Sequence, residues 1–156
     1  MSFTHLDAAG HARMVDVTEK QPTVRAATAQ GFVRCAAPVV AALRDGSVPK
    51  GDVLAVARIA GIQAAKRTPE LLPLAHVIGV HGAVVDATVT DEGVEVTATV
   101  RTADRTGVEM EALTARAGAA LATVGLGEGL DQATALEHAG LLSKAWGKPC
   151  GVRRGG

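Results

Sequence analysis

A strict alternation over residues 94–101 constrains the fold of this chain more than any other feature. Apolar and polar residues take turns there, in the order Val94-Glu95-Val96-Thr97-Ala98-Thr99-Val100-Arg101. Successive side chains of a strand point to opposite faces, so the pattern predicts a strand over residues 94–106 with one buried face. Residues 77–90 carry a weaker form of this pattern, and Asp91-Glu92-Gly93 suits a tight connection. We therefore expect an antiparallel hairpin with one face in solvent.

Three segments around this hairpin have helical character. Residues 53–65 are rich in Ala, and Asp52 in front of them is a good N-cap. Residues 38–43 form a compact apolar run, which begins with a proline that a first helical turn accepts and is followed by the turn Asp45-Gly46. Residues 107–124 are rich in Ala and Leu, and the glycines within 125–129 are expected to end that helix.

Extended structure is expected in three further segments. Residues 14–17 alternate as a short strand would, and residues 23–35 carry β-branched residues in a strand that Gly31 interrupts. Residues 139–142 are apolar and predict a short last strand. The resulting order of strand, helix, helix, strand, strand, helix and strand predicts an α+β domain, with helices packed on an antiparallel sheet.

Composition limits the classes of protein that fit. A chain of 156 residues with 47% hydrophobic and 21% charged residues is expected to form one domain over 1–156, with flexible ends at 1–12 and 146–156. Aromatic residues make up only 2%, so the core must be built from Ala, Val, Leu and Ile. The 16 basic and 16 acidic residues cancel, which argues against a nucleic-acid partner.

The sequence also indicates a cellular location. Residues 1–10 lack the basic start and apolar run of a signal peptide, and no apolar run approaches the roughly 18 residues of a membrane span. Cys35 and Cys150 have no metal-type spacing, which favours two free thiols in a reducing compartment. We expect a cytoplasmic protein with no membrane partner.

Two residues are candidates for chemistry because of where they stand. Lys50 lies in a Pro/Gly loop just before a helix start, where an anion is favoured, although a surface lysine beside an N-cap is the alternative. His76 lies in an apolar segment and is either an acid–base group or a hydrogen-bonded core histidine. His81 together with His76 would suit a metal ion only with a third ligand, and none presents itself, so no metal is expected.

The remaining candidates are charged residues near the ends of elements. Glu109 and Glu111 are two apart at a helix start, so they do not share a helical face. They either stabilise the helix start, or one faces a ligand while the other holds a base or an ammonium group. Lys144 and Lys148 form a late cationic contact or belong to a solvated tail.

Taken together, these residues carry a family resemblance. The segments that carry it occur in one order along the chain: 14–17, Lys50-Gly51-Asp52, 57–68 (ARIAGIQAAKRT), Leu72-Pro73-Leu74 with His76, and 105–114 (RTGVEMEALT). They resemble the cyclic pyranopterin monophosphate synthase (MoaC-type) family of molybdenum cofactor biosynthesis, from about residue 4 to residue 124.

The resemblance implies a fold, a reaction and an assembly. Members are ferredoxin-like α+β subunits that form hexamers, each a trimer of dimers, with active sites at a subunit interface. The implied activity is that of a lyase, which converts 3′,8-cyclo-7,8-dihydro-GTP to cyclic pyranopterin monophosphate and releases pyrophosphate. No metal or organic cofactor is implied.

The resemblance also assigns roles residue by residue. Lys50, His76 and Lys144 match site residues of the family and are the expected catalytic groups. The expected substrate-binding residues are Leu74, Ala75, His76, Glu109, Met110 and Glu111.

At several positions the chain departs from the family pattern. Ala75 replaces a cysteine, Gly125 replaces the catalytic aspartate, and Glu128 replaces the catalytic lysine. Loss of an acid–base group costs orders of magnitude in rate, so a second interpretation follows. In it, the chain is a catalytically impaired paralogue that binds a purine nucleotide or assembles with an active partner. A third is a family offshoot acting on a different cyclised nucleotide.

Overall fold

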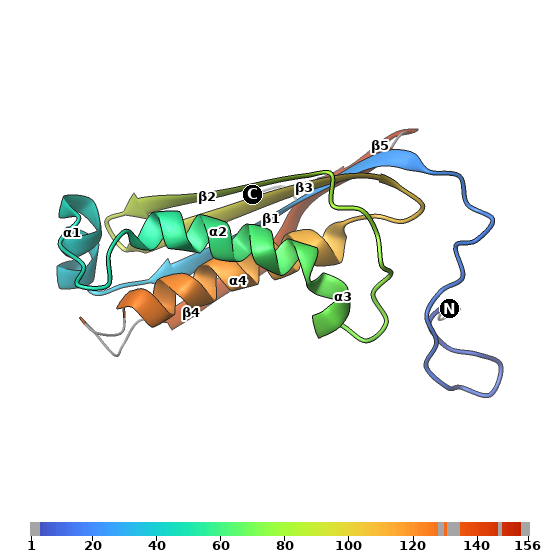
Figure 1. The fold of residues 1–156 in the computed structure, drawn as a ribbon, viewed down its shortest axis with the longest axis horizontal. Helices are drawn as coiled ribbons and strands as arrows, with labels where there is room; N and C mark the ends of the chain where they lie inside the picture. The colour runs from blue at the N-terminus through green and yellow to red at the C-terminus, as the bar shows by residue number, and fades with distance from the viewer. Residues whose placement is uncertain (1–3, 128–129, 131–134, 147, 154–156) are drawn as a thin grey trace.

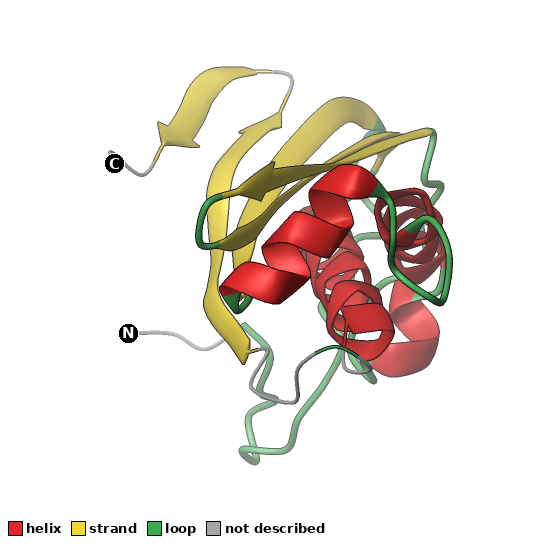
Figure 2. Cartoon of the chain, turned by 90° about the vertical axis from the view of Figure 1, so that its left-hand side faces the viewer, coloured by secondary structure: helices red, strands yellow, loops and turns green. Residues whose placement is uncertain are grey.

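The chain folds into one antiparallel sheet with helices on a single face (Figures 1 and 2). The computed structural model describes residues 4–127, 130, 135–146 and 148–153, and within 135–153 it describes the backbone and the side chain of Ser143 alone. The elements, in order, are β1 (Thr23–Arg34), α1 (Ala37–Asp45), α2 (Val53–Lys66), α3 (Thr68–Leu71), β2 (Gly82–Thr90), β3 (Gly93–Asp104), α4 (Glu109–Gly127), β4 (Ala135–Trp146) and β5 (Lys148–Arg153).

The sheet topology is ferredoxin-like. Its strand order is β2-β3-β1-β4-β5, and every neighbouring pair is antiparallel. Helix α2 connects β1 to β2, and α4 connects β3 to β4, so each crossover encloses one strand of the other unit. This arrangement confirms the expected α+β architecture and adds β5, for which the sequence pattern offers no signal.

The predicted antiparallel hairpin is present as β2 and β3, with Val94 paired to Val89 and Val100 to Ala83. The apolar residues of the alternation are fully buried, as the pattern predicts. The strand expected over 77–90 begins only at Gly82, and residues 77–81 form a loop. The strand expected over 14–17 is wrong: this segment has no regular secondary structure and pairs with no strand, so its alternation reflects no sheet face.

At two places, glycines were expected to end or interrupt an element, and the element continues through them. Gly31 does not interrupt β1, because it pairs with Val96 on one side and Ala139 on the other. Helix α4 does not end at the first glycine of 125–129 but continues to Gly127. The other two helices agree with expectation: Asp52 caps α2 by accepting a hydrogen bond from the Ala55 amide at 3.0 Å, and Gly46 ends α1 in the left-handed conformation.

Helices α2 and α4 lie side by side across the sheet, and small residues bring them together (Figure 1). A Cβ placed on Gly118 would lie 2.7 Å from the Ala64 Cβ, and one placed on Gly61 would lie 2.9 Å from the Ala115 carbonyl oxygen. Real atoms do not approach that closely, so each contact needs a glycine. The two helices therefore form one closely packed layer.

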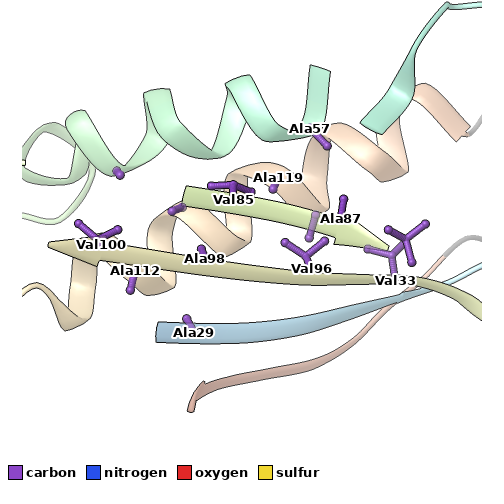
Figure 3. Packing of buried hydrophobic residues seen from close by; sticks show 14 of the residues in the cluster. Ala29, Val33, Ala57, Val85, Ala87, Val96, Ala98, Val100, Ala112 and Ala119 are labelled. Carbon is purple, nitrogen blue, oxygen red and sulfur yellow. The ribbon is translucent and has the colours of Figure 1, made fainter. Parts of the chain in front are cut away.

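The core lies between this layer and the sheet (Figure 3). It is built almost wholly from Ala and Val. Val85 and Ala87 are 4% and 7% exposed, and six further members are fully buried: Ala29, Val33, Ala57, Val96, Ala98 and Ala119. No described aromatic side chain belongs to it, as the composition predicts. Short side chains let the backbone of the helices approach the sheet closely, which fixes where the ends of α4 project.

Candidate active site

The first wall of the candidate site is the start of α4. The turn Thr106–Val108 leads into the helix. Val108 is buried, and its carbonyl oxygen accepts a hydrogen bond from the Ala112 amide at 2.9 Å, which fixes the turn. A Cβ on Gly107 would collide with the Glu109 carboxylate, so this carboxylate lies directly over the glycine. Glu111 is on the inner side of the helix and is 3% exposed. The two carboxylates therefore differ in environment although they are neighbours.

The second wall is the loop that follows α3. Leu74 and Ala75 lie against the start of α4, where they line a common cavity with Met110. His76 comes next, and its Nε2 donates a short hydrogen bond to the carbonyl oxygen of Val15. A carbonyl can only accept, so neutral His76 carries its proton on Nε2 and its lone pair on Nδ1. The hydrogen bond holds the N-terminal segment against the site.

A third group of contacts ties the surrounding loops to the end of β3. Asp104 accepts hydrogen bonds from the Gly79 amide at 3.1 Å and the Arg105 amide at 2.7 Å, and these bonds lower the pKa of its carboxyl. The Arg105 side chain in turn donates through Nε to the Lys20 carbonyl at 3.1 Å. The segments before β1, before β2 and before α4 are thereby joined at one edge of the domain.

The two walls and the N-terminal segment border a cavity of about 250 Å³. Leu74, Ala75 and His76 line one side, and Glu109, Met110 and Glu111 line the other, with Lys20 and His5 at its margin. His76 also borders a shallower cleft of about 550 Å³ that contains Arg105 and Asp16. An apolar hollow of about 620 Å³, formed by Leu72, Pro73 and their neighbours, adjoins on the other side. Apolar surface beside a few convergent polar groups is typical of a small-molecule site.

The electrostatics of the cavity centre on Glu111. Burial raises the pKa of its carboxyl, the neighbouring Glu109 charge raises it further, and His76 opposes the rise. A buried carboxyl with a raised pKa, beside a histidine that offers a lone pair, is a combination able to donate a proton from one group and accept a proton at the other. The cavity therefore has the chemical means for acid–base work.

The structure brings six of the predicted site residues together, and a seventh, Lys50, lies far from them. Leu74, Ala75, His76, Glu109, Met110 and Glu111 share the cavity. Lys50 lies at the opposite end of α4, where its Nζ donates to the Gly125 carbonyl at 2.8 Å. Glu111 and Gly125 are about 21 Å apart along a helix with a 1.5 Å rise per residue.

Three other predicted positions have separate outcomes. Lys144 lies in β4 with its backbone opposite Ala27, and its side chain is outside the described residues, as is all of Glu128. His81 is not directed to a metal, because its Nδ1 accepts a hydrogen bond from the Ala103 amide at 2.9 Å. Within the part of the chain that the structure describes, no group of three His, Cys, Asp or Glu residues is placed to hold a metal ion.

Sequence reasoning missed Lys20, Arg105 and His5, which lie in or beside the cavity. Lys20 and Arg105 had one usable signal: Lys20 is a basic residue shortly after the recognised segment 14–17, and Arg105 is the first residue of the recognised segment 105–114. His5 has no such signal, because only the fold carries residues 4–15 back across the site.

The chain matches the MoaC family over residues 14–147. It belongs to this family. It is 54% identical to a cyclic pyranopterin monophosphate synthase of Streptomyces coelicolor over 146 residues, which are 94% of this chain and 86% of that protein. It is 49% identical to the synthase of Geotalea uraniireducens over 156 residues, covering 99% of this chain and 98% of that one. A relative from Mycobacterium tuberculosis H37Rv, named cyclic pyranopterin monophosphate synthase 2, is 49% identical over 146 residues, covering 94% of this chain and 87% of that protein.

Among the described residues, no helix combines the length and the apolar character that crossing a membrane requires.

Proposed function

We propose that this MoaC-family chain is a cyclic pyranopterin monophosphate synthase of molybdenum cofactor biosynthesis. It would convert 3′,8-cyclo-7,8-dihydro-GTP to cyclic pyranopterin monophosphate, with pyrophosphate as the leaving product. One observation carries the proposal: the six residues expected to bind substrate line a single cavity at the start of α4. Relatives of this chain at 49–54% identity bear the name of that synthase.

The cavity suggests a division of labour within this reaction. His76 would take up a proton through Nδ1, since its Nε2 is engaged by Val15. Glu111, whose pKa burial raises, would supply or relay protons, and Glu109 lies at the more open side of the cavity. Lys20 and Arg105 place positive charge next to the cavity, which a triphosphate substrate requires.

Lys50 fits the proposal only if it reaches substrate from another subunit. In a single chain it lies at the wrong end of α4 for the cavity, and it is exposed. We therefore propose, as the family resemblance implies, a cytoplasmic homo-hexamer built as a trimer of dimers, with each site shared between subunits. Lys144 would be a further cation of that site.

A direct assay tests the proposed reaction. Purified protein is incubated with 3′,8-cyclo-7,8-dihydro-GTP, and pyrophosphate and the pterin product are measured against a buffer control. Product formation that disappears in His76→Ala supports the proposal. No product above the buffer control would refute the enzymatic activity and would leave the family assignment intact.

A specific observation keeps a second candidate function open, that of a binding paralogue without turnover. Gly125 falls where the family resemblance implies an aspartate, and a Cβ there would have no atom of the described residues within 4 Å. Among these residues, the first side-chain atom of an aspartate would therefore fit without a clash. If wild type is silent and the double variant Gly125→Asp with Glu128→Lys turns over, the rest of the site is intact and the wild-type chain is an impaired paralogue.

A further inference from the structure

Residues 5–13 form a small hairpin that stands apart from the sheet and from the two long helices (Figure 1). Leu6 and Ala12 form an isolated antiparallel bridge, and the Arg13 amide donates to the His5 carbonyl at 2.8 Å. All of these residues are exposed. We call residues 5–13 the N-terminal hairpin.

Asp7 holds the turn of this hairpin. Its Oδ1 accepts hydrogen bonds from the Ala9 and His11 amides, each at 2.9 Å, and the His11 amide is the first cause of the lowered pKa of its carboxyl. The Asp7 backbone pairs with the His11 carbonyl and the Gly10 amide, and Gly10 is in the left-handed conformation. Because these bonds are all local, the N-terminal hairpin is a preformed unit that loses little entropy when it packs against something.

The hairpin is tethered beside the cavity by its base. Val15 lies two residues after Arg13, and its carbonyl accepts the short hydrogen bond from His76 Nε2. At the other strand of the hairpin, His5 lines the same cavity as His76 and Met110. The tether therefore keeps the His5 side chain at the margin of the cavity, although the hairpin itself is exposed.

The apolar hollow of about 620 Å³ separates the hairpin from the body of the domain. His5 and Ala12 line it on the hairpin side, and residues 72–75 and Met110 line it on the other. Apolar side chains are exposed on both sides, with Leu6 at 40% and Met110 at 45%. Movement of the hairpin into the hollow would remove apolar surface from water on both sides, and this burial favours closure.

We propose that the N-terminal hairpin is a lid, which closes into the hollow when substrate fills the cavity and brings the His5 imidazole into contact with the substrate. The inference rests on the proposed function, because it concerns the same cavity. Among the described residues, no group bonds to the His5 imidazole, so both of its ring nitrogens are available to a ligand. Closure also excludes water from the reacting groups, which strengthens the electrostatic interactions inside the cavity.

Two histidines of the same hairpin test the contact. Isothermal titration uses GTP as a stable probe, because it carries the triphosphate and the purine but is not cyclised. His5→Ala should raise the Kd for GTP about three- to tenfold, the value of one hydrogen bond. His11→Ala is the matched control and should bind as wild type, because the His11 side chain is 80% exposed and lies outside the cavity lining. An unchanged Kd in His5→Ala, or a wild type that does not bind GTP, would overturn the contact.

Asp7 separates the hairpin from its histidine. Asp7→Ala removes the acceptor of both turn amides, so it should weaken GTP binding about as much as His5→Ala, although Asp7 does not line the cavity. Asp7→Asn keeps an oxygen acceptor and should restore most of the affinity. If Asp7→Ala bound GTP as wild type does, the hairpin would not position His5 and the lid would be refuted.

Chemical cross-linking tests the closure itself. In a Cys150→Ser background, Ala12→Cys and Leu72→Cys place one thiol on each side of the hollow, and Cys35 is buried and should not react. A short bismaleimide should link the two thiols within one chain, faster with GTP than without it. Ala12→Cys with Val84→Cys is the control and should not link within the chain, because Val84 lies on β2 away from the hollow. Equal rates with and without GTP would show that the hairpin does not close on a ligand.

The lid and the proposed function can fail separately. If wild type binds GTP and cross-links as expected but forms no product from 3′,8-cyclo-7,8-dihydro-GTP, the proposed function fails and the lid stands. If wild type forms product while His5→Ala keeps the wild-type Kd and KM, the lid fails and the proposed function stands.

Discussion

The two ends of α4 differ in how much of their surroundings the chain itself supplies. At the N-terminal end, three loops converge, Glu111 is 3% exposed, and His76 and Asp104 hold their neighbours by hydrogen bonds. At the C-terminal end, the exposed Lys50 donates to the Gly125 carbonyl, and a Cβ on Gly125 would have no atom of the described residues within 4 Å. Among the described residues, the same helix thus begins at an enclosed cavity and has an exposed surface near its other end.

This difference teaches where each kind of function comes from. A group whose environment is enclosed by its own chain can have a shifted pKa and a fixed orientation, and Glu111 has both the burial and the shift. An exposed group such as Lys50 contributes charge but little positional precision until something packs against it. The N-terminal end therefore has the enclosed groups that the proposed acid–base chemistry needs, whereas the exposed Lys50 near the C-terminal end contributes charge.

The largest expected effect is the loss of the proposed acid–base chemistry at the N-terminal end of α4. His76→Ala removes the proton acceptor, and we expect product formation to fall on the order of 100- to 10,000-fold. The Kd for a substrate analogue should change far less, because most of the cavity lining stays in place. Steady-state assays and isothermal titration measure the two quantities, and equal losses in both would mean that His76 only binds.

The next effect compares two glycines of α4 in free energy of unfolding. Gly118→Ala should destabilise the protein by roughly 1–3 kcal/mol, because its Cβ would lie 2.7 Å from that of Ala64. Gly125→Ala should stabilise it by about 0.5–1 kcal/mol, because alanine favours the helix and no atom of the described residues obstructs the methyl group. Urea titration gives both values. If both substitutions changed the free energy of unfolding in the same direction, the expected difference in packing between the two positions would be contradicted.

A smaller effect concerns Lys50 at the C-terminal end of α4. Lys50→Ala should lower the free energy of unfolding by less than about 1 kcal/mol, since a cation at a helix C-terminus contributes no more than that. It should nevertheless weaken binding of the triphosphate substrate at least tenfold in the assembled protein. Affinity measured at low and high salt checks the electrostatic origin. Unchanged affinity would return Lys50 to the role of a surface lysine.

The smallest effect is the pH dependence that Glu111 imposes on stability. Its folded-state pKa is raised, so the folded protein binds this proton more tightly than the unfolded chain does. The associated stability is fully present below the ordinary carboxyl pKa of about 4.3, and it is lost as pH rises through the raised value. Glu111→Gln should remove this decline. Unfolding curves recorded across that pH range would contradict the assignment if wild type and variant changed in parallel.

Sequence periodicity was a good guide wherever a local pattern decided the structure. The alternation over 94–101 placed β3, and Asp52 with its Ala-rich run placed α2, because both signals act between near neighbours. It failed where tertiary contacts override local preference. Gly31 stays in β1 because strands on both sides pair with it, and residues 14–17 look like a strand but are held by His76 instead.

The candidate site was predictable only in part for a related reason. Residues 74–76 and 109–111 stand out in the sequence by motif, and the fold brings them together. Their common cavity depends on the start of β2 lying beside the end of β3, where Gly82 pairs with Arg101, because this pairing brings the loop before β2 next to the start of α4. Lys20 and Arg105 join it through a side-chain-to-backbone hydrogen bond between positions 85 residues apart. The distance of Lys50 from the cavity also required the fold.

The Ala- and Val-rich core has a practical consequence for watching this protein in solution. Nearly every buried position carries one or two methyl groups, from Ala29 on β1 to Ala119 on α4. Methyl groups keep narrow NMR lines in large particles because they rotate rapidly. Selective labelling of two amino-acid types would therefore place reporters throughout the interior, on the sheet and on both long helices. Their chemical shifts could follow ligand entry at one end of α4 and subunit assembly in the same spectrum.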